Sequence, residues 1–176
     1  MRCATLTDAA GIAQVHVQSW RATYPGILPA AEIERHTLAR RAGMWTRVLQ
    51  VPAPGLFVAV AADEAGVDGV RGFASTGAFR VEPTGGVGQG EGQGDGELNA
   101  LYVLPGAQRE GIGRRLFDAG ANALREAGFH AMRCWVLHGN PSIAFYERLG
   151  GARVASKTFM VDGVAVEEHC YRFKLG

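Results

Sequence analysis

A short segment between a predicted strand and a predicted helix carries the residue types that could bind an anion. The strand ends at Val103, Pro105 stops it, and an amphipathic helix begins near Gly111. Gly111 and Gly113 lack side chains, so the main chain there can approach an oxyanion and adopt the angles that a nest of amides needs. Because the free N–H groups of a first helical turn point the same way, this segment predicts a pyrophosphate site.

Two glycines alone are a weak indicator, because the chain contains 25 of them. The segment also fits neither common nucleotide loop. It has no Gly-Lys-Ser/Thr of a Walker loop, and it has no acidic residue placed as a Rossmann loop requires. The order of strand, proline, glycines and helix is therefore more specific than the glycines themselves.

That order, with Gln108-Arg109-Glu110-Gly111-Ile112-Gly113 followed by Arg-Arg-Leu, resembles the pyrophosphate loop of the GCN5-related N-acetyltransferase (GNAT) superfamily. A later segment, residues 140–151, is similar to a second motif of that superfamily, with an Asn, an aromatic pair and Glu-x-Leu-Gly. It departs only at Gly151, where the family has an aromatic residue, and we expect this change to affect packing rather than chemistry. Together with the helix that bears Trp20 and the segment 25–29, the resemblance covers essentially the whole chain.

The resemblance implies that acetyl-coenzyme A (acetyl-CoA) is the acyl donor. In relatives, the strand before the loop splays from its neighbour, and its backbone groups pair with the pantetheine arm as though with another strand. The residues that the resemblance assigns to acetyl-CoA are Leu101, Tyr102, Val103, Gln108, Arg109, Glu110, Gly111, Ile112, Gly113, Arg114, Asn140 and Ser142. Asn140 is also expected to cap the short helix that follows it.

Acetyl transfer to an amine requires proton transfers, because an alkylamine with a pKa near 10.4 is mostly protonated at pH 7. The resemblance places Glu97 where several relatives carry a general base, with a solvated surface residue as the alternative. Asn99 is the neighbouring candidate for ordering a water in the acceptor site. Tyr146 stands where the family's tyrosine protonates the leaving thiolate, with a core aromatic as the alternative.

In relatives the first two helices form one wall of the acceptor site. Trp20 and Tyr24 lie on the first of these helices and are candidates for acceptor binding, although core packing is the commoner role of such aromatics. Acidic residues near the Gly-rich segment, Glu91 and Asp95, hint faintly at a cationic acceptor.

Hydrophobic patterning predicts the elements that would position these groups. We expect a strand at 2–6, a helix capped by Thr7, a helical stretch from 27 to 52, strands at 56–61, 70–79 and 97–103, a helix at 111–127, a strand at 132–137, a helix at 141–149, and a hairpin at 154–174 turning at Asp162-Gly163. This order predicts an α/β fold. The resemblance specifies a mixed, mostly antiparallel central sheet with helices on both faces and a splayed pair of parallel strands.

Length and composition limit the function classes. The 176 residues predict a single domain at 1–176, with a flexible Gly-rich loop at 83–96, and the resemblance implies that it is an N-acetyltransferase domain. The chain has 18 Lys and Arg against 17 Asp and Glu, so no net field favours nucleic acid or a membrane surface. No signal-peptide pattern or spanning apolar run is visible, so we expect a cytoplasmic protein. The five histidines and three cysteines show no metal-ligand spacing, so no metal is expected.

The leading hypothesis is an acetyl-CoA-dependent N-acetyltransferase that acts on a primary amine, of a small molecule or a peptide, by direct attack of the amine on the thioester. Two alternatives stay open: an acyl-CoA sensor of the same fold without turnover, and an adaptor whose Gly-rich loop recruits a partner. Relatives are frequently dimers, so the resemblance also allows a homodimer. The identity of the acceptor does not follow from the fold.

Overall fold

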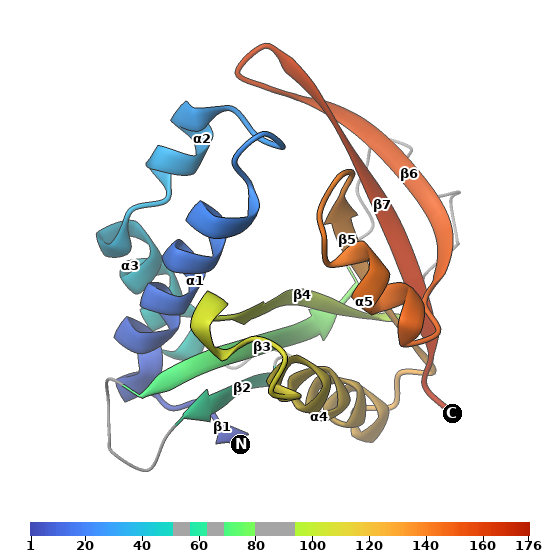
Figure 1. Cartoon of the computed structure of the whole chain (residues 1–176). Coiled ribbons are helices and arrows are strands. Elements are labelled where there is room, and N and C mark those ends of the chain that lie inside the picture. The colour runs from blue at the N-terminus through green and yellow to red at the C-terminus, as the bar shows by residue number, and fades with distance from the viewer. Residues whose placement is uncertain (51–56, 63–68, 80–93) are drawn as a thin grey trace.

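The computed structural model describes residues 1–50, 57–62, 69–79 and 94–176 (Figure 1). Most of the predicted Gly-rich loop at 83–96 lies outside these residues. The elements are β1 (Arg2–Cys3), η1 (Leu6–Asp8), α1 (Ala9–Thr23), α2 (Ala30–Arg35), α3 (Leu38–Gln50), β2 (Phe57–Ala62), β3 (Val70–Ala78), β4 (Gly96–Val103), η2 (Pro105–Ala107), α4 (Ile112–Glu126), β5 (Ala131–Leu137), α5 (Ile143–Arg148), β6 (Ala152–Val161) and β7 (Val164–Lys174).

The strands form one seven-stranded sheet in the order β1-β2-β3-β4-β5-β7-β6. All neighbouring pairs are antiparallel except β4 and β5, which are parallel. In Figure 1, α1 and α3 lie together on one side of the sheet and α4 lies on the other. The predicted fold class is therefore confirmed. None of the helices in the described part of the chain has the length and apolar character that crossing a lipid bilayer requires.

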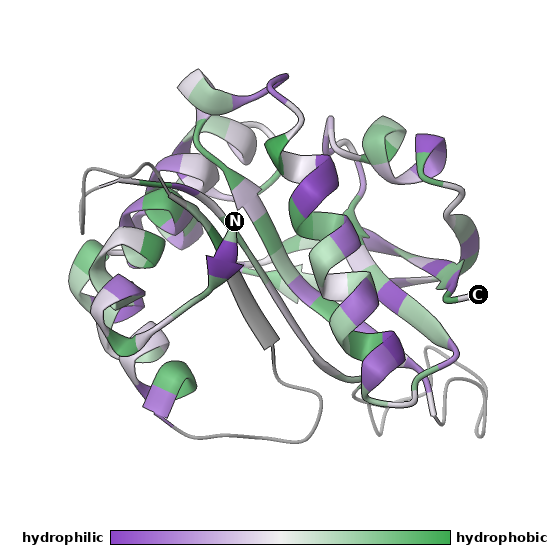
Figure 2. Ribbon diagram, turned by 90° about the horizontal axis from the view of Figure 1, so that it is seen from below, coloured by the Kyte–Doolittle hydropathy of each residue, from purple (hydrophilic) through white to green (hydrophobic). Residues whose placement is uncertain are grey.

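Helix α4 packs closely on the sheet through one apolar stripe. Ile112, Leu116 and Leu124 are buried on this stripe, and the ribbon in Figure 2 alternates between hydrophobic and hydrophilic residues. Gly120 sits where a Cβ would lie only 2.9 Å from the Thr76 methyl group of β3. A glycine at this position therefore lets the helix approach the sheet that carries the site.

The N-terminus differs from the prediction. The first strand ends at Cys3 instead of continuing to Leu6, and a short 3₁₀ turn precedes α1. Asp8, not Thr7, organises this turn: its carboxylate accepts the Thr5 N–H at 2.7 Å and pairs with the Arg2 guanidinium at 2.7 Å. These local hydrogen bonds compete with continued strand pairing, which is the reason the strand stops early.

The predicted helical stretch at 27–52 is interrupted. It forms two helices, α2 and α3, because His36 leaves the helical region at φ −83° and ψ 65°. Thr37 then starts α3: its hydroxyl accepts the Arg40 N–H at 3.3 Å, in the manner of an N-cap. Residues 51 and 52 lie outside the described part of the chain.

The C-terminal hairpin is confirmed. It turns at Asp162-Gly163, where φ is +48° and +79°, as a two-residue hairpin turn requires. The departure at Gly151 also has a packing reason. A Cβ at this position would lie 2.7 Å from the Phe173 ring, so an aromatic from β7 already fills the space beside residue 151.

Candidate active site

The central feature of the site is the place where β4 and β5 separate. The two strands pair only through Gly96 with Met132 and Glu97 with Arg133. Beyond these pairs β4 continues to Val103 alongside β3, and Figure 1 shows β5 leaving it at a wide angle. The predicted splay of the parallel strands is confirmed, and it opens one edge of β4.

A β-bulge in β4 accompanies this separation. Ser75 of β3 pairs with Ala100, whereas the next residue, Thr76, pairs with Leu98, so Asn99 is the extra residue of the bulge. Bulges bend a strand and re-aim its side chains, and they are frequent beside functional sites.

The bulge decides which side chains of β4 face which layer. Leu98 and Leu101 both lie against α4, although a spacing of three would place them on opposite faces of a regular strand. Glu97 lies between Leu98 and Gly96, both of which face α4, so the Glu97 side chain points to the α1 side. Tyr102 contacts α1 directly. The bulge therefore places Glu97 and Tyr102 on one face of the sheet.

Backbone groups of Leu101 and Val103 point into the gap. The Leu104 N–H donates to Arg71 O of β3 at 2.9 Å, so the alternating residues 101 and 103 face the other edge. Val103 O already accepts hydrogen bonds from the Ser19 hydroxyl at 3.3 Å and from Gln108 Nε2 at 3.4 Å. The Leu101 groups and the Val103 N–H are thus the positions at which a strand-like ligand could pair.

The predicted pyrophosphate loop lies on the surface and leads directly into α4. Gly111, the residue before the helix, has φ +75°, and Arg109 also has a left-handed φ of +66°. No side chain caps this helix, so the N–H groups of its first turn are not used by a capping residue. A Cβ on Gly111 would meet no described atom within 4 Å, so the space beside the loop is open.

Two residues predicted to bind acetyl-CoA, Glu110 and Arg114, form ion pairs with other side chains of the protein. The Glu110 carboxylate pairs with the Arg71 guanidinium of β3 at 2.5 Å, which ties the loop to the sheet. Arg114 pairs with Asp118 one turn along α4 at 2.8 Å, and both side chains are exposed. At Gly113 the structure would also accept a side chain, because a Cβ there would lie 3.7 Å from the Phe145 ring, which is an ordinary contact distance.

Helix α5 closes the other side of the gap. It begins at Ile143, two residues later than predicted, but Asn140 still caps the turn that leads into it. Asn140 Oδ1 accepts the Ser142 N–H at 2.8 Å. Tyr146 is buried on this helix, and burial raises the pKa of its hydroxyl well above the usual range, with Cys134 and Tyr102 raising it further. The phenol therefore keeps its proton at neutral pH.

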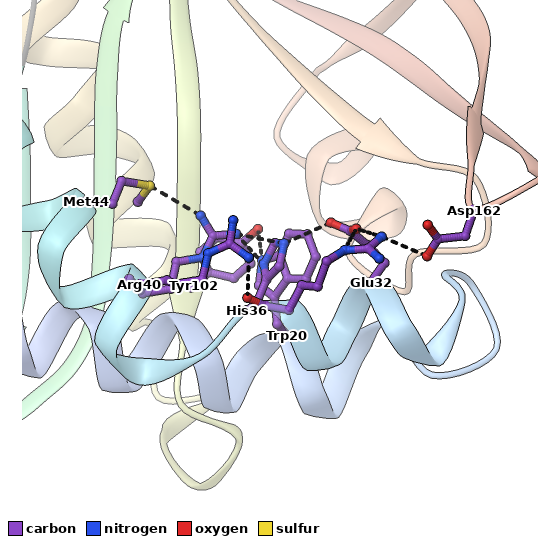
Figure 3. A network of polar contacts seen from close by, with 9 residues as sticks. Trp20, Glu32, His36, Arg40, Met44, Tyr102 and Asp162 are labelled. Carbon is purple, nitrogen blue, oxygen red and sulfur yellow. Dashed lines mark hydrogen bonds and ion pairs between the residues drawn. The ribbon is translucent and has the colours of Figure 1, made fainter.

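An aromatic wall from α1 lies against Tyr102 (Figure 3). Trp20 Nε1 donates to the Tyr102 hydroxyl at 3.0 Å, and the Tyr24 and Tyr102 hydroxyl oxygens lie 3.4 Å apart. The His36 ring stacks on Trp20 with a centroid separation of 3.6 Å, and the Arg41 guanidinium lies 5.4 Å from the centre of the Trp20 ring. The structure thus brings both predicted acceptor residues next to the strand that borders the gap.

Burial raises the pKa of Tyr24, and Tyr102, Tyr146 and Glu168 contribute in the same direction. Three tyrosines, one at the C-terminal end of α1, one on β4 and one on α5, therefore lie within electrostatic range of one another. Glu97 belongs to the same region, since it contributes to the raised pKa of the Cys134 thiol after burial and Cys170.

Sequence reasoning missed His16. This buried residue stacks on Tyr102 with a centroid separation of 4.9 Å, and its Nδ1 accepts the Trp45 Nε1–H at 3.1 Å. Burial, together with Arg41 and His36, lowers the pKa of His16 to about 3, so the ring is neutral at pH 7. His16 lies four residues before Trp20, which places both on one face of the helix, and this spacing could have indicated that His16 belongs to the aromatic wall.

The hint that Asp95 favours a cationic acceptor is wrong. Asp95 is buried, and its carboxylate pairs with Arg133 at 2.6 Å and with Arg172 at 2.9 Å. Desolvation raises its pKa, but the hydrogen bonds from Arg172 and Arg133 outweigh this and lower it overall. Asp95, which directly precedes β4, therefore ties the start of β4 to Arg133 of β5 and Arg172 of β7. Glu91 lies outside the described residues.

Comparison with known proteins gives consistent results. Residues 75–160 match the family model of FR47-like proteins. The chain is 41% identical to the uncharacterized N-acetyltransferase YuaI of Bacillus subtilis strain 168 over 96% of this chain and 88% of that protein.

Solved structures of low identity share the fold. An N-acetyltransferase from Staphylococcus aureus Mu50 superposes with a TM-score of 0.72 at 18% identity, covering 99% of this chain and 97% of that one. YncA of Salmonella typhimurium, whose structure was solved with acetyl-CoA, gives a TM-score of 0.71 at 21% identity, covering 99% of this chain and 92% of that one.

Proposed function

Because this chain belongs to the GCN5-related N-acetyltransferase superfamily and is an N-acetyltransferase, we propose that it moves an acetyl group from acetyl-CoA to a primary amine of a small molecule or peptide. The observation that carries this proposal is the open edge of β4 joined directly to the uncapped first turn of α4. The edge offers backbone groups to an extended ligand, and the turn offers amides to an anion.

The residues present fit acetyl-CoA. The pyrophosphate needs backbone amides with open space before them, and the described part of the chain leaves that space at Gly111. The pantetheine arm needs an unpaired strand edge, which Leu101 and Val103 supply. Asn140 and Ser142 lie across the gap at the start of α5. Among the described residues none accepts a hydrogen bond from Asn140 Nδ2, so this group is a donor for an amide carbonyl. Bound acetyl-CoA supplies the acetyl group as an activated thioester.

Glu97 is proposed as the general base. It lies at the last residue pair before β4 and β5 separate, it is half-buried, and it faces the α1 side together with Tyr102. A carboxylate at this position can take a proton from an ammonium group, directly or through a water that Asn99 helps to order. Trp20 and Tyr24 provide aromatic surface for the carbon skeleton of the acceptor.

Tyr146 is proposed as the general acid. Its raised pKa keeps a proton on Oη across the range in which an amine can be deprotonated by Glu97. Among the described side chains none forms a hydrogen bond with this hydroxyl, so its O–H can be directed at a ligand sulfur in the gap. A tyrosine buried only for packing would gain nothing from a polar tip at this place.

The test is thiol release from acetyl-CoA across a panel of amines, including polyamines, amino acids and peptides with free N-termini. The wild-type enzyme is expected to turn over at least one class. Tyr146→Phe and Glu97→Gln are each expected to lower kcat by about 10²–10⁴-fold, the usual contribution of a general acid or base.

Tyr171→Phe is the matched control, because Tyr171 is also buried but its hydroxyl already donates to Glu147 at 3.3 Å. Its kcat should stay within a few-fold of wild type. If the protein binds acetyl-CoA tightly but releases no thiol with any amine, the enzyme hypothesis is rejected in favour of an acyl-CoA sensor. Equal rates for wild type and Tyr146→Phe would show that Tyr146 is not the general acid.

A further inference from the structure

Three side chains that no step of the proposed reaction uses converge beside the β5–α5 turn. His138 follows the end of β5, and Glu167 and His169 lie on β7. One potential ligand atom of each residue lies within 4.8 Å of the others. The side chains supply two imidazoles and one carboxylate, a donor set that binds first-row transition metals well.

The sheet register explains why these residues meet. Glu167 and His169 are two apart on one strand, so their side chains share a face. Val136 of β5 is paired with His169, and the His138 N–H donates to Glu167 O at 2.8 Å, which continues the ladder beyond β5. The His138 and His169 ring centroids are consequently 5.3 Å apart, with the rings tilted by 56°.

Two of the three ligand atoms already have a spacing close to that in a tetrahedral zinc site. His169 Nε2 and Glu167 Oε1 lie 3.1 Å apart. Zinc bonds to nitrogen and oxygen of about 2.0–2.1 Å place two ligand atoms of a tetrahedron about 3.3 Å apart. His169 is buried and therefore held in place, whereas His138 is exposed and can rotate to complete the set. We propose that His138, Glu167 and His169 form a binding site for Zn²⁺, with water as the fourth ligand.

One neighbouring group opposes the ion. The Arg153 guanidinium lies 3.5 Å from Glu167 Oε1, and its side chain is 51% exposed. It must move towards solvent when a cation binds, which a half-exposed arginine on β6 can do. The site therefore binds more weakly than a closed structural zinc site, in which every ligand is protein-derived.

The proposed zinc site lies next to the turn that leads into α5. His138 lies two residues before Asn140, whose side chain caps the turn that leads into α5 and Tyr146. An ion held by His138, Glu167 and His169 ties this turn to β7. Binding of Zn²⁺ is thus expected to restrain the segment that borders the acetyl-CoA gap, and it would stabilise the fold by mass action.

The experiment is calorimetric titration of Zn²⁺ into metal-stripped protein, with thermal melting of the same samples. Wild type should bind one ion and melt at a higher temperature with Zn²⁺ present. His138→Gln should weaken binding by at least about tenfold, the effect of losing a ligand or its orienting partner. Without metal it should melt like wild type, because His138 is exposed. Co²⁺ bound to wild type should show the visible absorption of a tetrahedral site.

His130→Gln is the matched control, since His130 is an exposed histidine just before β5. It should leave Zn²⁺ affinity unchanged. The proposal is overturned if wild type binds no Zn²⁺, if His138→Gln binds it equally well, or if His130→Gln weakens binding as much as His138→Gln. None of these readouts depends on acetyl transfer.

Discussion

The indole Nε1 of Trp20 donates a 3.0 Å hydrogen bond to the phenol oxygen of Tyr102, and so joins α1 to β4 across 82 residues of sequence. Tyr24 approaches the same phenol oxygen at 3.4 Å. The helix proposed to contact the acceptor is therefore attached to the strand proposed to hold the donor. Movement of one element would be transmitted to the other through these part-buried polar contacts, because breaking them leaves polar groups without partners.

Gly111→Ala should weaken acetyl-CoA binding by about tenfold, because a residue with a Cβ is strained by roughly 1 kcal/mol at φ +75° and will displace the loop amides. Gly128→Ala is the control. Gly128 follows the same helix at φ +88° with open space around it. Gly128→Ala should therefore lose as much stability as Gly111→Ala, but its affinity for acetyl-CoA should equal that of wild type. Calorimetry and urea unfolding of both variants measure the two effects. Equal affinities for the two variants would contradict a role of the loop in binding.

Acid should destabilise the protein through His16. Its pKa is lowered to about 3 in the fold, against about 6.5 in an unfolded chain, so below pH 6.5 the unfolded state binds the proton more readily. The free energy of unfolding should therefore fall by about 1.6 kcal/mol between pH 6.5 and pH 5 through this residue alone. Urea unfolding at both pH values measures this. His16→Asn, which keeps an acceptor near Trp45 Nε1, should be less stable at pH 7 but show a smaller pH dependence; an unchanged pH dependence would exclude His16 as its source.

Asp95→Ala should cost about 3–5 kcal/mol of stability, because it leaves the buried Arg133 guanidinium without its carboxylate. The control is Asp118→Ala, which removes an exposed ion pair on α4 and should cost less than about 1 kcal/mol. Since the pKa of Asp95 is lowered in the fold, its contribution is present above the ordinary Asp pKa and is lost as the pH falls below it. A loss for Asp95→Ala no larger than for Asp118→Ala in urea unfolding would show that the buried pair is not stabilising.

The Arg35–Asp162 ion pair should affect binding of the acceptor rather than the stability of the fold. Arg35 of α2 pairs with Asp162 at the tip of the β6–β7 hairpin at 2.7 Å, which links α2 to this hairpin. Figure 3 shows Asp162 in the same network of polar contacts as Trp20 and His36 of the aromatic wall. Asp162→Asn removes the charge and tolerates the left-handed φ of +48°. We expect the acceptor KM to rise several-fold, with little change in the acetyl-CoA KM. Arg35→Gln combined with Asp162→Asn should be no worse than either change alone; additive effects would mean that the two residues act independently.

Local patterns in the chain were sufficient for much of the fold. The strand, proline, glycines and amphipathic helix around residues 103–113 predict the loop, because each of these preferences acts over a few neighbouring residues. The same holds for the hairpin turn at Asp162-Gly163, whose left-handed angles suit those two residue types. Helix boundaries and the break at His36 were less predictable, since they depend on competing local hydrogen bonds of similar strength.

Relationships across the sheet were decided by the tertiary structure. The bulge at Asn99 puts Glu97 and Tyr102 on one face, although their odd spacing alone implies opposite faces. Asp95 looked like part of an exposed acidic loop and is instead buried between two arginines. His138 and His169 meet because β5 and β7 are neighbours. Strand order and register bring residues together from distant parts of the chain, and the short-range periodicity of a sequence carries no record of them.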